Sequence, residues 1–278
     1  MNSTESKNFG TEKLQNSLSA FSWQTAHPKL IRPILASKAA YTGNWLNSSP
    51  ITSIGLRMSN ETILVAIDLR LEAKLCEPHQ CTCGALVDAR GLHGHSCRRS
   101  ACRHAKHSLL NNTIWHAMNK AGVQSTKEPT GLLRSDGKRP DGVTLILWAK
   151  GRCLAWDLTV PDTFATSYNA STSYLPGLAA EHAATLKKQK YTALSQTHEY
   201  VPLAIKTSGV FNSEGLEFVK KIGGRLSNAS SDEKETAYLF QRIAVTIKRG
   251  NSISFSGSFE QVTIRGSLLQ GEASKSNK

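Results

Sequence analysis

Cysteine and histidine side chains crowd into one short stretch of this 278-residue chain. Cys81 and Cys83 are separated by one residue, and His93 and Cys97 follow as a second close pair. Thiolate sulfur and imidazole nitrogen are the donors that tetrahedral Zn²⁺ prefers, and two such pairs supply four of them. The pattern predicts a zinc knuckle. Because four protein ligands leave no open position on the metal, the predicted ion is structural rather than catalytic.

Two nearby side chains are alternative ligands. The gap between Cys81 and Cys83 is tighter than the usual two residues, so Cys76 could replace one of them, and His95 could replace His93. The less specific interpretation is a set of free thiols and surface histidines. Clustered Cys and His in a chain whose start does not resemble a secretory signal are more typical of metal ligands than of disulfides, which favours the metal.

Acidic side chains form a second candidate group. Asp141 precedes an apolar run at 142–148, and Asp157 lies inside the next run at 153–160. A Gly-containing turn separates the two runs, so we expect an antiparallel hairpin that brings both carboxylates to the same end. Two oxygen donors there predict a Mg²⁺ or Mn²⁺ site. Glu128, at the end of the preceding apolar run, could add a third carboxylate.

Each aspartate also has an ordinary interpretation. Asp141 follows Pro140 and precedes Gly142, so it could be a turn residue. Asp157 is surrounded by apolar residues, where an unpaired charge would be costly. Its position therefore indicates either a functional carboxylate or a buried ion pair.

The elements that would position these side chains follow from the pattern of apolar residues. Helical spacing predicts helices, and short apolar runs predict strands. The predicted helices cover 61–75, 104–122, 178–194, 213–226 and 231–248, and the predicted strands cover 123–128, 142–148, 153–160, 200–207 and 252–259. The fold class predicted from this order is α/β (α+β).

Composition and charge limit the classes of function. No apolar run is long enough to span a membrane, so we expect no membrane association. Lys and Arg total 34 against 21 Asp and Glu, a net charge of +13, which favours a polyanionic partner. We expect an intracellular protein of the nucleus or cytoplasm, because the start lacks the apolar segment of a secretory signal.

The order helix, three strands, helix, strand, with Pro140-Asp141 and then Asp157-Leu-Thr159, resembles the PD-(D/E)xK restriction-endonuclease-like fold. With Lys138-Arg139 before Pro140 and the Cys/His knuckle upstream, it is similar to the C-terminal region of certain non-LTR retrotransposon polyproteins. The similarity covers about residues 75–254. The polymerase signature Tyr-x-Asp-Asp does not occur, so no polymerase activity is expected.

The resemblance implies a αβββαβ core and assigns roles to particular residues. Asp141 and Asp157 would hold the catalytic metal. The lysine usually found two residues after the second acid is here Thr159, and Lys187-Lys-Gln-Lys190-Tyr matches a stretch expected on the following helix. The catalytic lysine is thus left open between Lys187 and Lys190, and Lys188 points elsewhere on the helix.

The resemblance also implies how the chain is divided and what it contacts. A helical remnant would span residues 1–70, the knuckle 71–103, the nuclease domain 104–265 and a disordered tail 266–278. The implied partner is target DNA, with element RNA as a second possibility. The side chains expected to contact nucleic acid are Arg98, Arg99, Arg103, Lys138 and Arg139.

The implied function is a metal-dependent DNA endonuclease that nicks target DNA and leaves a 3′-hydroxyl to prime reverse transcription. The competing hypothesis is a zinc-containing module that binds nucleic acid without cutting it. A short chain without a polymerase is compatible with either.

Overall fold

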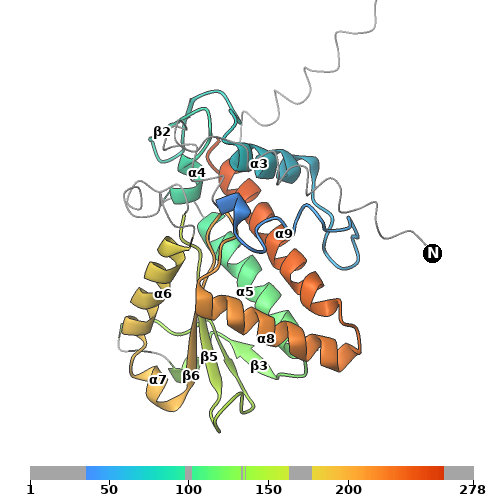
Figure 1. Ribbon diagram of the computed structural model, residues 1–278. Coiled ribbons are helices and arrows are strands. Elements are labelled where there is room, and N and C mark those ends of the chain that lie inside the picture. Colours follow the sequence, from blue (N-terminus) through green and yellow to red (C-terminus); the bar gives the residue numbers. More distant parts are fainter. Residues whose placement is uncertain (1–35, 98–101, 133, 135, 163–176, 260–278) are drawn as a thin grey trace, which may run out of the picture.

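The computed structural model describes residues 36–97, 102–132, 134, 136–162 and 177–259. Helices and two small sheets alternate along this part of the chain (Figure 1), which confirms a mixed α and β class. The helices are α3 (Asn60–Leu71), α4 (His93–Ser96), α5 (Cys102–Lys120), α6 (Leu178–Lys190), α7 (Leu194–Thr197), α8 (Ser213–Ser230) and α9 (Glu235–Ser256), with a 3-10 turn at Thr130–Leu132. The strands are β1 (His79–Gln80), β2 (Leu86–Val87), β3 (Ser125–Lys127), β4 (Gly142–Thr144), β5 (Leu154–Thr159) and β6 (Glu199–Ala204).

The larger sheet has the strand order β3-β4-β5-β6. β3 and β4 are antiparallel, as are β4 and β5, whereas β5 and β6 are parallel. The antiparallel pairs are joined by loops, residues 128–141 between β3 and β4 and residues 145–153 between β4 and β5. The parallel pair is joined through α6 and α7, because a parallel pairing needs a crossover connection.

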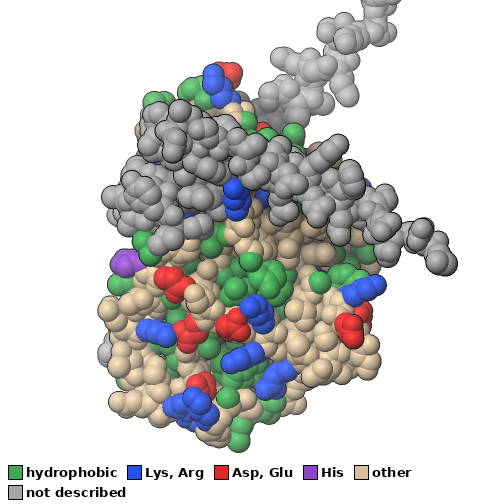
Figure 2. All heavy atoms as spheres, viewed as in Figure 1, with side chains coloured by type: hydrophobic (Ala, Val, Ile, Leu, Met, Phe, Trp, Pro, Cys, Tyr) green, Lys and Arg blue, Asp and Glu red, His purple; other side chains and the backbone are tan. Residues whose placement is uncertain are grey.

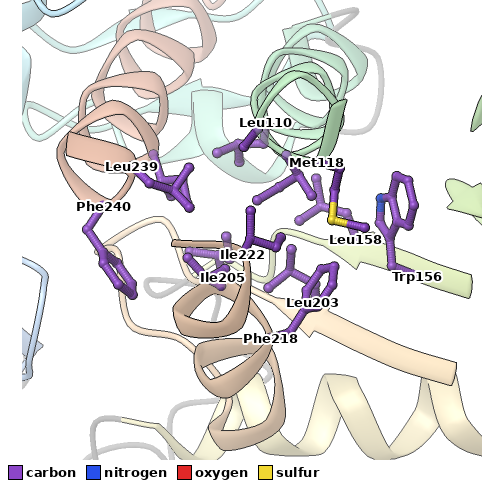
Figure 3. Packing of buried hydrophobic residues seen from close by; sticks show 14 of the residues in the cluster. Leu110, Met118, Trp156, Leu158, Leu203, Ile205, Phe218, Ile222, Leu239 and Phe240 are labelled. Atoms are coloured by element: carbon purple, nitrogen blue, oxygen red, sulfur yellow. The ribbon is translucent and has the colours of Figure 1, made fainter. Parts of the chain in front are cut away.

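The two faces of this sheet are covered by different helices. On one face, alternate residues of β5 (Leu154, Trp156 and Leu158) enter the main core with α5, α8 and α9 (Figure 3). On the other face, α6 packs its small residues Ala180 and Ala184 against Ala204 of β6. Since side chains alternate along a strand, Asp157 faces α6, away from the main core.

α9 connects the main core to the N-terminal part of the described chain. Val65 and Leu69 of α3 form an apolar cluster with Phe255 near the end of α9. Gly94 of α4 lies so close to α9 that an added Cβ would be 2.5 Å from the Ser254 carbonyl oxygen. The Cys/His segment is therefore docked on the same helix that packs along α5. Among the described residues, no helix is long and apolar enough to cross a bilayer.

Most of the predicted elements occur with shifted bounds, and the helix predicted over 178–194 ends at Lys190. Two predicted strands differ most. The strand predicted over 142–148 is regular only at Gly142–Thr144. The strand predicted over 252–259 is wrong, because α9 continues to Ser256. Its alternating Ser and apolar residues imitate strand periodicity, but Ser254 and Ser256 donate hydrogen bonds to carbonyl oxygens one turn earlier (2.9 and 3.0 Å), and Phe255 packs against α3.

Candidate functional site

The four predicted zinc ligands meet at one point. Cys81 and Cys83 lie in the turn between β1 and β2, where Gly84 has a φ of +89° that favours glycine. His93 begins α4 and Cys97 follows its last residue. Their ligand atoms all lie within 4.8 Å of one another.

The distances within this group are close to those of ligands around a tetrahedral metal. Two thiolates bound to zinc at about 2.3 Å would be about 3.8 Å apart, and a thiolate and an imidazole about 3.6 Å apart. The Cys81 and Cys97 sulfurs are 3.9 Å apart, and the Cys83 sulfur is 3.2 Å from Nε2 of His93. Hydrogen bonding, first from the Ala85 backbone, lowers the pKa of the Cys83 thiol to about 6, which favours the thiolate that binds metal. This group can hold a metal such as zinc.

The two alternative ligands lie elsewhere. The Cys76 sulfur is directed at the backbone carbonyls of Asp88 and Ala89, at 3.6 and 3.7 Å. His95 is only 4% exposed. Burial, followed by the nearby charges of Lys106 and Lys248, lowers its pKa well below the usual value, so the ring is neutral.

Asp141 and Asp157 are brought together by the pairing of β4 with β5. Gly142 is opposite Trp156 and Val143 is opposite Ala155. One step further in the same register, Asp141 is opposite Asp157, and directly opposed residues project to the same face. Gly142 is required here, because an added Cβ would lie 2.0 Å from the Trp156 ring. The glycine after Asp141 therefore serves packing rather than a turn.

Burial and mutual repulsion separate the acidities of the two carboxyl groups. The Asp157 side chain is 4% exposed, and burial together with the charge of Asp141 raises its pKa to about 6. Burial also disfavours the Asp141 carboxylate. However, the hydrogen bond and charge of His107 outweigh this effect and lower the pKa of Asp141. One charged and one more readily protonated carboxyl group are expected when two acids share a site.

His107, on α5, was not predicted as a site residue. Its Nε2 lies 3.0 Å from Oδ2 of Asp141 and 3.2 Å from the carbonyl oxygen of Leu158. The same Asp141 oxygen accepts a hydrogen bond from the Leu158 backbone at 2.6 Å. Burial lowers the pKa of His107, but the hydrogen bond and charge of Asp141 raise it by more, so the net shift is upward.

A sequence signal for His107 did exist. His107 and Asn111 continue, at helical spacing, the buried stripe formed by Ile114 and Met118 on α5. Asn111 donates a hydrogen bond to the Asp141 carbonyl oxygen at 3.1 Å. Its side-chain oxygen accepts one from the Trp156 indole at 2.9 Å. Polar residues that extend an apolar stripe mark the place where α5 contacts the acidic site.

The structure distinguishes the three lysines at the end of α6. The Lys187 ammonium lies 2.7 Å from Oδ2 of Asp157. Lys190 instead contacts the Tyr191 hydroxyl at 3.2 Å, and burial followed by the charge of Lys187 lowers its pKa. Lys188 pairs with Glu214 at 2.7 Å, away from the aspartates, as its helical position predicts. Asp157 is thus part of a buried ion pair as well as part of the acidic pair.

Glu128 does not join the acidic pair in this structure. Its backbone N–H donates to the Asp141 carbonyl oxygen at 3.1 Å, so the residue itself is adjacent. Its φ is +47°, which breaks the regular strand geometry. The side chain is 62% exposed and forms an ion pair with Arg139. To supply a third carboxylate, the Glu128 side chain would have to leave Arg139 and turn toward the two aspartates.

The predicted nucleic-acid contacts are only partly described. Lys138 is exposed, and Arg139 is partly exposed beside Glu128. The carbonyl oxygen of Arg139 accepts a hydrogen bond from the Tyr191 hydroxyl at 2.8 Å, which ties this segment to α6. Arg98, Arg99 and the side chain of Arg103 lie outside the described residues, as does the predicted tail at 266–278.

A cavity of about 470 Å³ lies between the knuckle and the acidic site. Thr159 at the end of β5 and the two lysines Lys187 and Lys190 line one side, and His95 and Ser96 of α4 also contribute. The hydroxyl of Thr159 stands where the resemblance would place a lysine. The cavity gives this end of the sheet a solvent space whose lining mixes Lys187 and Lys190 with the acid Asp162 and with apolar residues such as Leu186.

Comparisons with protein-family models and with curated proteins found no match for this sequence. Functional assignment therefore depends on the geometry of the two candidate sites.

Proposed function

We propose that the chain is a metal-dependent DNA endonuclease of a retroelement. Support comes from the element order α5, β3, β4, β5, α6, β6, which is the order that the resemblance implies. Further support comes from the net charge of +13, which suits a phosphodiester polymer. The role in priming reverse transcription is inherited from the resemblance alone.

The observation that carries the proposal is the facing pair Asp141 and Asp157. Within the described part of the chain, Oδ2 of Asp157 is buried and has no well-aligned hydrogen bond, although the Lys187 ammonium is close. The Lys187 ammonium, 2.7 Å away, compensates the charge of this buried oxygen, so a divalent ion at the pair would share Asp157 with Lys187. The pair, facing one side of the sheet, is a donor set that suits Mg²⁺ or Mn²⁺.

His107 and the Leu158 carbonyl extend this donor set. Two ligands about 2.1 Å from an octahedral ion, at right angles, are about 3.0 Å apart. The separations from His107 Nε2 to the Asp141 carboxylate and to the Leu158 carbonyl, 3.0 and 3.2 Å, are those of hydrogen bonds from a ring N–H, so His107 would become a metal donor only after it releases this proton. An imidazole donor shifts the preference from Mg²⁺ toward Mn²⁺.

The expected reaction is hydrolysis of one DNA strand. A divalent ion held there would acidify a water molecule and stabilise charge on the phosphodiester. Water oxygen bonds to phosphorus, the bond from phosphorus to O3′ breaks, and the proton passes to O3′, which leaves a 3′-hydroxyl and a 5′-phosphate. Lys187, held by Asp157, is placed to offset the additional negative charge at phosphorus.

Plasmid nicking tests the proposal. The zinc-loaded full chain should nick supercoiled plasmid with added Mn²⁺ or Mg²⁺, and Asp141→Ala or Asp157→Ala should lower the rate at least about 100-fold. His107→Ala should raise the Mn²⁺ concentration needed for half-maximal rate. Glu217→Ala, at an exposed acid on α8, is the matched control and should leave nicking unchanged. Nicking that persists in both aspartate variants would refute the proposed site.

The second candidate is a zinc-containing module that binds nucleic acid without cutting it. Two observations favour it. Thr159 replaces the usual lysine, and in this structure the Lys187 ammonium is already paired with Asp157. Tight DNA binding without metal-dependent nicking in the unmodified chain would establish this function instead.

A further inference from the structure

The connection between β4 and β5 exposes three consecutive large apolar residues. Leu145, Ile146 and Leu147 are 62%, 38% and 64% exposed. They follow directly after β4, where a buried strand would ordinarily continue or a polar turn would begin. Neighbouring exposed apolar residues in a basic protein indicate a contact with a partner rather than ordinary surface.

This apolar run is held in place by hydrogen bonds. The Leu145 backbone N–H donates to the Gln124 carbonyl oxygen at 2.8 Å. The Thr144 hydroxyl donates to the Ile146 carbonyl oxygen at 2.7 Å and accepts from the Leu154 backbone at 2.9 Å. Trp148 then donates its N–H to the Arg152 carbonyl oxygen at 2.9 Å. The side chains are thus presented by an ordered hairpin.

The surroundings of the run are aromatic and basic. The Arg225 guanidinium from α8 lies 4.2 Å from the ring centre of Trp148, and Lys150 is exposed at the turn. Arg152 is also present, paired with Glu199. Figure 2 shows apolar side chains at the lower end of the molecule, where this hairpin lies in Figure 1, with Lys and Arg close by. The nearby positive charge favours a polyanion over an apolar protein surface.

We infer that the apolar run Leu145–Leu147, called here the hairpin tip, is a wedge that inserts between base pairs of duplex DNA. Aliphatic side chains flanked by basic residues are a common means of unstacking and kinking DNA. The inference rests on the proposed function for the identity of the polymer, but it does not require cleavage.

The test compares binding to an intact duplex with binding to the same duplex carrying a central two-base mismatch. Fluorescence anisotropy is measured on the full zinc-loaded chain without added Mg²⁺ or Mn²⁺. A wedge binds the mismatched duplex more tightly, because part of the unstacking cost is already met. We expect a preference of about tenfold in the unmodified chain, reduced to about equal affinity by Leu145→Ser/Leu147→Ser.

The matched control is Leu64→Ser/Leu71→Ser, at two exposed leucines of α3, which should keep the preference. Thermal melting checks that both double variants fold. A mismatch preference that survives the tip substitutions, or its absence from the unmodified chain, would overturn the inference. The inference would also be overturned if sedimentation showed that the unmodified chain is a dimer and that the tip substitutions dissociate it, while DNA binding stayed the same. Nicking without a mismatch preference would refute the wedge but not the endonuclease. A mismatch preference without nicking would refute the endonuclease but not the wedge.

Discussion

At the scale of single residues, the acidic site is built by packing constraints around two carboxylates. Gly142 admits the Trp156 ring next to Asp141, and Asn111 joins the Trp156 indole to the Asp141 backbone. His107 then fixes the carboxylate itself. The side chains that hold Asp141 therefore come from α5 and β5, while Asp157 depends on α6 for its cation.

The three lysines of α6 provide a test at this scale. Lys187→Met should lower the nicking rate at least about 100-fold, because its ammonium lies 2.7 Å from Asp157. Lys190→Met should have a smaller effect, since Lys190 contacts Tyr191. Lys188→Met is the control, because Lys188 pairs with Glu214 on the surface. Equal losses in all three variants, measured as initial rates on plasmid, would show a general charge effect and contradict the assigned geometry.

At the scale of elements, α9 organises the described chain. It packs along α5 and α8, supports α3, and at its end contacts the knuckle. His79 of β1 stacks on Phe259 with ring centres 4.0 Å apart, and its Nε2 lies 3.1 Å from the Ser258 hydroxyl. The knuckle is therefore coupled to the residues directly after this helix, and through Gly94 to Ser254 in its last turn.

Zinc should consequently stabilise more than its own loop. Cys97→Ser should abolish stoichiometric zinc by elemental analysis and expose amides of 79–97 and of the last turn of α9 to faster hydrogen exchange. A loss of about 2 kcal/mol would lower the melting temperature by roughly 4–8 °C. Cys153→Ser, at a thiol outside the cluster, should retain zinc. Unchanged zinc content in the Cys97 variant would contradict the assigned ligands.

At the scale of the whole molecule, Lys and Arg side chains lie both on the surface and in the interior. The face in Figure 2 mixes Lys and Arg with Asp and Glu around apolar side chains, so this face does not carry a basic track. In the interior, Lys248 is 6% exposed, with its ammonium 3.4 Å from the Ser208 carbonyl oxygen. Burial first, and then the charges of Arg70 and Lys106, lower the pKa of Lys248 to about 7.

This lowered pKa predicts how stability varies with pH. Between about pH 7 and 10.5 the unfolded chain binds a proton at Lys248 that the folded chain does not, so stability rises with pH across this range. Below pH 7 both states are charged and the full cost of burial remains. Lys248→Met should therefore increase the free energy of unfolding at pH 6 by roughly 1–4 kcal/mol and remove this pH-dependent rise.

Denaturant unfolding at several pH values measures the effect, with Lys221→Met on the surface as the control. A parallel pH dependence in the unmodified chain and in Lys248→Met would show that Lys248 is not the group responsible.

The sequence alone determined the features that depend on local spacing. The paired Cys and His residues predicted the four side chains that cluster in the structure, because these lie within a short segment whose own turns bring them together. Likewise, two strands and a tight turn were enough to predict that Asp141 and Asp157 share one end of a hairpin. The mixed α and β class followed from the same periodicities.

Only the tertiary structure decided the features that depend on contacts between distant segments. The choice of Lys187 over Lys190 beside Asp157 depends on how α6 docks on the sheet, and the entry of His107 depends on how α5 docks there. The helical end of α9 was decided by packing of Phe255 against α3, which overrode a local pattern typical of a strand. Spacing along the chain fixes which side chains share a face, but the position of one element against another is set by the packing of their buried surfaces.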